Sequence, residues 1–202
     1  MTVHNVTAEA ESFTCNAYLV EGERTTLIDA GTMPGIVDEI RAHVDDVDAV
    51  VITHAHGDHV ERLDEVLDAF DPDCYAYGEV SGRTHALDDG DELLVGDERV
   101  EVVYTPGHAD DHVSLVGDRS LYSGDVVVYN DGAFDDGSFG RTDMPGQSRE
   151  RLIESLHRLL GRLPESVEHL YAGHGDPFSG DVRSVIERAV ERADRREPKY
   201  PE

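Results

Sequence analysis

Basic residues are scarce in this chain of 202 residues: 17 Lys and Arg stand against 44 Asp and Glu, and Lys199 is the only lysine. The formal net charge at pH 7 is therefore −27. The sequence contains no basic stripe, so binding to nucleic acid would lack its usual electrostatic driving force. We therefore expect no nucleic-acid partner.

Long apolar runs are also missing. No stretch approaches the ~20 residues that a membrane span needs, and residues 1–10 hold no apolar segment of signal-peptide length. The two cysteines, Cys15 and Cys74, favour buried free thiols over a disulfide, which suits a reducing compartment. These absences predict a cytoplasmic protein without a membrane partner.

The length suits a single domain covering residues 1–202, or two halves of one sandwich, with a sizeable core. The sequence shows no long linker, low-complexity tract or short-period repeat. The polar segment 195–202 is expected to be a frayed tail.

Residues 53–59 carry an unusual density of ligand-type side chains: His54, His56, Asp58 and His59. This stretch follows the apolar run 49–52, which predicts a buried strand, and precedes helical spacing over 60–70. It therefore lies at the carboxyl end of a strand, where open α/β sheets bind their ligands. A solvated loop that happens to be rich in His is the alternative interpretation.

The spacing within this stretch predicts metal binding. Residues i and i+2 of an extended segment point to the same side, so His54 and His56 can reach one ion together. Asp58 and His59 follow as the chain turns into the helix, and they can point at a second ion. Packing alone explains such crowding poorly, because His and Asp prefer water unless they are paired or bound.

Three later strands are predicted to end in the same way. His108 follows the strand 100–104, Asp125 follows the strand 113–122, and His174 follows the strand 167–171. Each lies beside small residues that let the backbone approach a ligand closely. The candidate metal ligands are therefore seven: His54, His56, Asp58, His59, His108, Asp125 and His174.

This ordered set resembles the metallo-β-lactamase superfamily, in its hydrolase branch, from about residue 15 to residue 177. The resemblance implies a first ion on His54, His56 and His108, a second on Asp58, His59 and His174, and Asp125 bridging both. It also implies a four-layer αββα sandwich of two mixed sheets. Sequence pattern alone leaves the choice between α/β and α+β open.

Two features narrow the resemblance. Asp125 stands where true β-lactamases usually carry Cys, which points away from antibiotic hydrolysis. Residues 139–146, Phe-Gly-Arg-Thr-Asp-Met-Pro-Gly, and the later run 171–175 look like the glyoxalase II-like hydrolases. Persulfide dioxygenases carry a similar Gly-Arg-Thr-Asp run, so it does not separate the two. Too few residues follow residue 177 for the helical domain of glyoxalase II proper, so a single-domain relative is expected.

The activity implied is hydrolysis of a thioester, such as a hydroxyacyl-thiol, or of a related ester or lactone. Two divalent ions about 3.5–4 Å apart would lower the pKa of a bound water toward ~7, and the metal-bound hydroxide would attack the carbonyl. Asp58 could orient this nucleophile or carry a proton. The nitrogen and oxygen ligands suit Zn²⁺, with Fe or Mn as alternatives.

Two other functions stay open on the sequence alone. The first is a mononuclear-iron persulfide dioxygenase acting on a low-molecular-weight thiol persulfide. The second is a non-catalytic scaffold or sensor that binds metal without turnover. The sequence also leaves a homodimer open.

Further side chains have two interpretations each. Arg141 could hold a substrate carboxylate bidentately or pair with Asp143. Phe139 could line a substrate slot or pack onto the core. His112 could support a metal ligand or face substrate, and Asp29 could be the carboxylate partner of a ligating His or a turn residue.

The pattern of the remaining chain predicts alternating strands and helices. Strands are expected at 13–20, 25–28, 47–52 and 73–77, and a hairpin at 93–104 around Gly96 and Asp97. Helices are expected at 34–44, 60–70 and 152–163, and a last helix follows an N-cap at Asp181. Residues 81–91 are expected to form a loop in which His85 is a surface residue.

We expect salt to stabilise the fold. The acidic excess destabilises a compact state by self-repulsion, and this repulsion is screened because the Debye length falls to about 3 Å at 1 M salt. We interpret the composition as adaptation to a salt-rich, halophilic cytoplasm. The melting temperature should therefore be higher in multimolar KCl than in low-salt buffer, and equal melting temperatures would contradict this interpretation.

Overall fold

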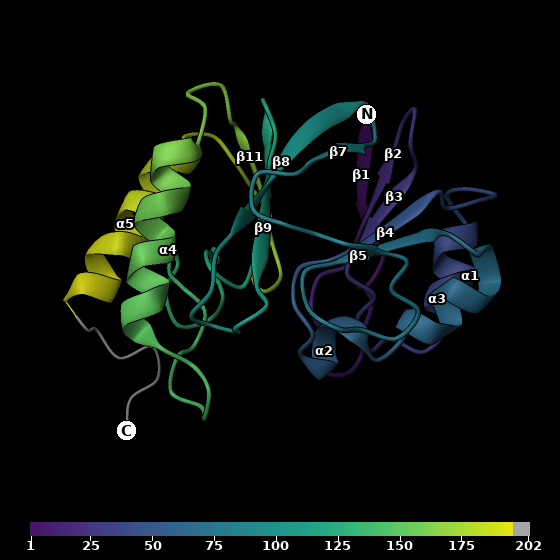
Figure 1. The fold of residues 1–202 in the computed structure, drawn as a ribbon, viewed down its shortest axis with the longest axis horizontal. Coiled ribbons are helices and arrows are strands. Elements are labelled where there is room, and N and C mark those ends of the chain that lie inside the picture. The colour runs from purple at the N-terminus through teal and green to yellow at the C-terminus, as the bar shows by residue number, and fades with distance from the viewer. Residues whose placement is uncertain (196–202) are drawn as a thin grey trace. The chain divides into compact units, whose positions relative to one another are not determined.

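Two separate hydrophobic cores organise the chain, which divides into the compact units Met1–Val100 and Glu101–Glu202. The structure is a computed structural model, and it describes residues 1–195. The expected tail falls almost wholly outside the described residues. Each unit is described below by itself (Figure 1).

The first unit is built on a mixed sheet of six strands in the order β1-β2-β3-β4-β5-β6. β1 to β3 are antiparallel neighbours, and β3 to β6 are parallel neighbours. The strands are Thr2–Asn5, Tyr18–Glu21, Thr26–Ile28, Ala49–Ile52, Asp73–Ala76 and His85–Ala86. The helices of this unit are α1 (Ile36–Arg41), α2 (Gly57–Val60) and α3 (Leu63–Phe70).

The core of the first unit lies between this sheet and two of its helices. Ile36 and Ile40 of α1 are fully buried, as the i, i+4 spacing of one helix face predicts. Leu63 of α3 belongs to the same cluster, together with Val50 and Ile52 of β4. This packing holds the carboxyl end of β4 in place.

The second sheet is also mixed, and its order is β12-β11-β10-β9-β8-β7. β10 and β11 are parallel, whereas β8/β9, β9/β10 and β11/β12 are antiparallel pairs. The strands are Glu92–Val95, Glu98–Tyr104, Val113–Val116, Ser120–Gly124, His169–Ala172 and Phe178–Ser179. The boundary between the two units falls within β8.

Two amphipathic helices, α4 (Arg149–Arg162) and α5 (Val182–Asp194), cover this second core and lie side by side in Figure 1. Ser148 accepts a hydrogen bond from the Arg151 N–H and caps α4, while Asp181 accepts one from the Ser184 N–H and caps α5. The Ser184 hydroxyl also donates to Asp181, and this hydrogen bond and the one from the Ser184 N–H lower the pKa of Asp181. The N-cap expected at Asp181 is confirmed.

Parallel strands bring distant residues together at one edge of each sheet. Asp29 follows β3, and residue 53 follows the parallel neighbour β4. In the second unit, Asp125 follows β10 and Gly173 follows the parallel neighbour β11. The Gly173 N–H donates to the Gly124 carbonyl over 2.8 Å, which ties these two strand ends together.

Several expected elements differ in the structure. The strand expected at 13–20 begins at Tyr18. The strand expected at 113–122 is a hairpin, because the chain reverses at residues 117–119 between β9 and β10. The loop expected at 81–91 contains the short strand β6, in which the His85 ring stacks on Tyr75.

The helix expected at 60–70 begins earlier, at Gly57, and is interrupted between α2 and α3 by contacts with other segments. The Arg62 N–H donates to the carbonyl of Gly31 over 3.1 Å, instead of to the residue four positions before it. The Asp58 carbonyl accepts instead from the Cys15 N–H over 3.3 Å. Tertiary hydrogen bonds therefore interrupt the helix and fix the backbone of the His-rich stretch.

The expected α/β class with two mixed sheets and flanking helices is confirmed. Cys15 and Cys74 are both free and buried, as expected, and burial raises the pKa of the Cys74 thiol to about 11. Among residues 1–195, no helix is both long enough and apolar enough to cross a bilayer.

We predict that Leu159→Ala destabilises the second unit. Leu159 of α4 is fully buried in the second core. Removing a buried Leu side chain and leaving a cavity costs about 2–5 kcal/mol in the free energy of unfolding. Denaturant unfolding at constant high salt measures this loss. A free energy of unfolding equal to that of the wild type would contradict the observed packing.

Candidate metal centre

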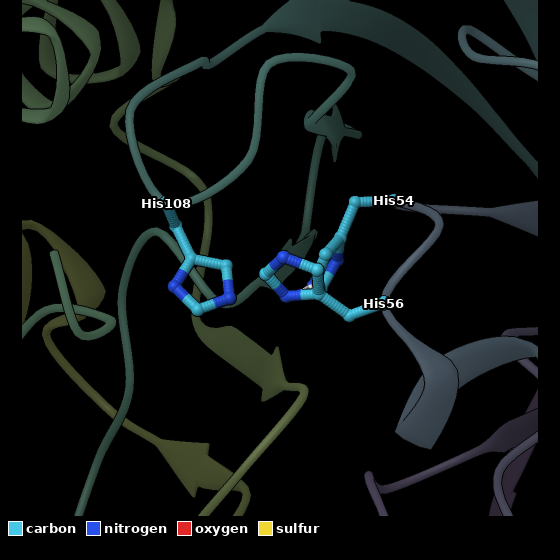
Figure 2. Close-up of side chains that lie close together, drawn as sticks. All are labelled: His54, His56 and His108. Carbon is cyan, nitrogen blue, oxygen red and sulfur yellow. Dashed lines mark hydrogen bonds between the residues drawn. The ribbon is translucent and has the colours of Figure 1, made fainter. Parts of the chain in front are cut away.

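The loop after β4 places two imidazoles against each other in the first unit. The Nε2 atom of His54 lies 3.1 Å from the Nδ1 atom of His56, and Figure 2 shows how both side chains leave this loop. His54 is buried and His56 is half-buried. This arrangement agrees with the i, i+2 spacing, which predicts that both rings point to one side.

The buried carboxylate of Asp29 fixes the orientation of the neighbouring His59 ring and of Thr53, which contacts His54. Asp29 Oδ1 accepts a hydrogen bond from the Thr53 N–H, and Oδ2 accepts from Thr53 Oγ1 and from His59 Nδ1, each over 2.8 Å. Because Thr53 Oγ1 donates to Asp29, it can accept from His54 Nδ1, which lies 3.1 Å away. The sequence left two roles open for Asp29, and the structure shows that it is the carboxylate partner of a His.

Asp29 adopts a left-handed backbone conformation with φ of 60°. Among residues with a side chain, Asp and Asn tolerate this region best. The buried Cys15 lies beside the same pair, since single ligand-type atoms of Cys15, Asp29 and His59 lie within 4.8 Å of one another. Because His59 Nδ1 already donates to Asp29, we regard this group as a support for His59.

The tautomers of both rings follow from these contacts. Nδ1 of His59 carries the proton that it donates to Asp29, and Nδ1 of His54 carries the proton that it donates to Thr53. The lone pair of each ring is therefore on Nε2. The Nε2 atom of His59 lies 3.9 Å from Asp58 Oδ2, on the side away from Asp29.

The second unit holds a cluster of its own. Asp125 Oδ2 lies 3.2 Å from His108 Nε2 and 3.4 Å from His174 Nε2. His108, which is also drawn in Figure 2, has Nδ1 at 2.8 Å from the Arg141 carbonyl and must donate to it. The lone pair of His108 is consequently on Nε2, the atom nearest Asp125. The structure thus brings together the three candidate ligands of this unit.

Gly140 lies directly against this cluster. A Cβ atom at this position would lie 2.0 Å from the Asp125 carbonyl oxygen and 2.9 Å from His108 Nδ1. Only glycine leaves room for such an approach of the backbone. Sequence reasoning missed both Gly140 and Thr53 as supporting residues, although each lies within or beside a motif.

His112 supports Asp125 rather than lying on a surface. It is fully buried, its Nε2 accepts a hydrogen bond from the Asp125 N–H over 2.9 Å, and its Nδ1 lies 2.8 Å from Thr105 Oγ1. Of the two roles left open by the sequence, this geometry favours support of a metal ligand over contact with substrate.

The structure also favours the structural roles of two rim residues. Phe139 is fully buried in the second core, and the Arg149 guanidinium lies 4.1 Å from its ring centre. Arg141 makes two hydrogen bonds, of 2.9 and 2.8 Å, to the carboxylate of Asp143, which depress the pKa of Asp143. Packing and an ion pair are therefore the contacts seen for Phe139 and Arg141, and substrate contacts stay a prediction for both.

The donor sets of the two units fit divalent metal ions. The Nε2 atom of His54 and the Nδ1 atom of His56 are 3.1 Å apart, close to the ~3.3 Å that separates two ligand atoms at ~2.0–2.1 Å in a tetrahedral site. A carboxylate oxygen and the lone pair of His108 at 3.2 Å repel each other unless a cation or a proton lies between them. His and Asp side chains suit Zn, Fe or Mn, and the donors alone do not choose among them.

Comparison with known proteins identifies similar chains. The family model of the metallo-beta-lactamase superfamily matches residues 11–197. Hydroxyacylglutathione hydrolase from Vibrio cholerae serotype O1 is 31% identical over 152 residues, which is 73% of this chain and 56% of that protein. The chain therefore spans little more than half the length of this curated relative.

Solved structures show the same fold. ETHE1 from Myxococcus xanthus superposes with a TM-score of 0.72 at 23% identity, covering 92% of this chain and 87% of that one. TTHA1623, solved in a di-iron-bound form, has a TM-score of 0.69 at 27% identity, covering 87% of this chain and 93% of that one.

We predict that Asp29→Asn lowers metal affinity without disturbing the backbone. Asn tolerates the same left-handed conformation, but its amide N–H₂ would face the Nδ1–H of His59. The proton of His59 would then move to Nε2 and block the ligand atom. Because changes to such supporting residues typically lower affinity 10–100-fold, we expect a loss of this size in a zinc competition titration.

Asp48→Asn provides the matched control, because Asp48 is exposed and its carboxylate accepts from the Thr25 N–H, which lies outside the His-rich stretch. It should bind zinc like the wild type. Equal affinities in the Asp29 and Asp48 variants would show that Asp29 does not set the tautomer of His59.

Proposed function

Because the chain belongs to the metallo-beta-lactamase superfamily, we propose that it is a metal-dependent hydrolase that cleaves a thioester, with a hydroxyacyl-thiol as the leading substrate class. The named activity of the Vibrio relative supports this substrate class. Related esters or lactones are the next candidates, because they present the same acyl carbonyl to the nucleophile.

The proposal includes the ligand assignment made from the sequence. One ion would be held by His54, His56 and His108, a second by Asp58, His59 and His174, and both by Asp125. The observation that carries it is the position of Asp125 Oδ2 within 3.2 and 3.4 Å of His108 and His174, one ligand from each proposed set. A carboxylate in this position is suited to bridging two ions.

Two divalent ions, most simply Zn²⁺, would supply hydroxide from a water near neutral pH and polarise the acyl carbonyl. The chain supplies the orientation. Asp29, through its hydrogen bonds to Thr53 and His59, keeps the Nε2 lone pairs in position. Asp58 is half-buried and lies in α2 next to His59, so it is the residue that we propose to orient the nucleophile and accept its proton.

Iron is the main alternative to zinc. The di-iron form of TTHA1623 shows that iron occupies a related fold. ETHE1, a persulfide dioxygenase, is another structural neighbour. This neighbour and the Gly-Arg-Thr-Asp run at 140–143 both support the second candidate function, which is oxidation of a thiol persulfide at a single iron. A scaffold that binds metal without turnover is the third.

Substrate panels separate the three. The purified protein, loaded with zinc or with iron in high-salt buffer, would be given hydroxyacyl-thioesters, lactones and a thiol persulfide. Thioester hydrolysis is expected. Oxygen uptake with the persulfide and no thioester turnover would establish the dioxygenase, and bound metal with no turnover would establish the scaffold.

We predict that Asp125→Ala loses metal and activity together. If Asp125 bridges both ions, its removal lowers the metal stoichiometry, measured by elemental analysis, in parallel with turnover. Asp118→Ala is the matched control, because Asp118 is exposed in the turn between β9 and β10. Normal stoichiometry and normal turnover in Asp125→Ala would refute the bridging role.

The proposal also covers the partners and the location of the protein. We propose a small-molecule acyl-thiol or ester as the only partner class, without nucleic acid or membrane, and a salt-rich cytoplasm as the location. A homodimeric state stays a prediction.

A further inference from the structure

One buried imidazole of the second unit is used by neither proposed ligand set. His112 is fully buried between the end of β8 and the start of β9. Burial of a neutral imidazole is common, but here both ring nitrogens make short polar contacts, at 2.9 Å and 2.8 Å. These contacts define what the ring does.

The contacts of His112 have only one consistent set of donors. The Asp125 N–H donates to Nε2, so the ring proton is on Nδ1 and is donated to Thr105 Oγ1. Thr105 Oγ1 lies 3.0 Å from Ser114 Oγ, which in turn donates to the Ser123 carbonyl over 3.2 Å. Thr105 must therefore donate to Ser114.

This chain of hydrogen bonds begins and ends on the same short segment. It leaves the backbone N–H of Asp125 and returns to the carbonyl of Ser123, two residues earlier. Between them, Gly124 has a left-handed φ of 49°, and the register of β10 against β11 is irregular at Tyr122 and Gly124. The segment that delivers Asp125 is thus irregular, and side chains from neighbouring strands fix it.

We propose that His112 is a positioning residue that fixes the backbone of Asp125 and thereby aims its carboxylate at both metal ions. This inference rests on the bridging role proposed above for Asp125. The carboxylate is attached directly to the backbone that His112 holds, and it lies within 3.4 Å of two ligand nitrogens. A small rotation of this backbone would therefore move the oxygen shared by both ligand sets.

The test compares variants that differ in one property of the side chain. His112→Gln retains an amide oxygen that can accept from the Asp125 N–H. His112→Leu fills the space with no acceptor. Leu159→Ala is the control for lost stability, because Leu159 is buried in the same unit but lies in α4, and His169→Gln is the control for the substitution at a partly exposed strand residue.

Two quantities are measured in high-salt buffer, both starting from protein stripped of metal. The first is zinc affinity and stoichiometry, by competition with a chromophoric chelator. The second is the hydrogen-exchange rate of the Asp125 amide, by NMR. Neither requires turnover, so an absence of thioesterase activity in the wild type would count against the proposed function and leave this comparison intact.

We expect His112→Leu to lose zinc affinity tenfold or more, within the range known for residues that support metal ligands, and to exchange the Asp125 amide faster. His112→Gln should retain most of the affinity, and both controls should bind like the wild type. Wild-type affinity in a folded His112→Leu would overturn the proposal, as would equal losses in the Leu and Gln variants or a loss of the same size in Leu159→Ala. If His112→Leu does not fold, Thr105→Val, which removes the acceptor for Nδ1–H, must lower affinity for the proposal to stand.

Discussion

A neutral imidazole offers a lone pair from only one of its two nitrogens, and the rest of the candidate centre depends on which one. In this chain a nearby hydrogen-bond acceptor fixes that choice for three rings. Asp29 accepts from His59, Thr53 accepts from His54, and the Arg141 carbonyl accepts from His108. In each case Nδ1 is the donor and the lone pair is left on Nε2, the atom that a metal ion would need.

The acceptors themselves are held by backbone contacts between distant segments. The carbonyl of His59 accepts from the N–H groups of Ala30 and Gly31, next to Asp29 in the chain. The second unit uses close approach instead, because Gly140 brings the Arg141 carbonyl to His108 with no side chain between. Each unit therefore orients its own candidate ligands through contacts within that unit, which agrees with the separate cores of the two units.

The sequence singled out the candidate ligands because each follows the end of an apolar strand, a pattern that depends only on local order. It left two roles open for Asp29 and for His112, and it did not predict Gly140 or Thr53 as supporting residues. Gly140 matters through a contact with Asp125 that no spacing reveals, and the break between α2 and α3 arises because Arg62 donates to Gly31. The prediction of a single strand at 113–122 was wrong for a local reason. Apolar residues continue on both sides of the turn at 117–119, so the turn does not interrupt the apolar pattern.

The parallel pairing of β10 and β11 has a consequence for how this centre could change. Asp125 and His174 are placed by the register of adjacent strands, and the bridge between Val128 and Ser138 closes the loop that follows Asp125 at its base. Beyond this base, Phe134 and Asp136 contact Arg192 of α5, so α5, rather than the strand ends that carry Asp125 and His174, holds residues 133–137. Their length and composition can vary while the ligands keep their geometry, so a new substrate preference could arise there without rebuilding the chemistry.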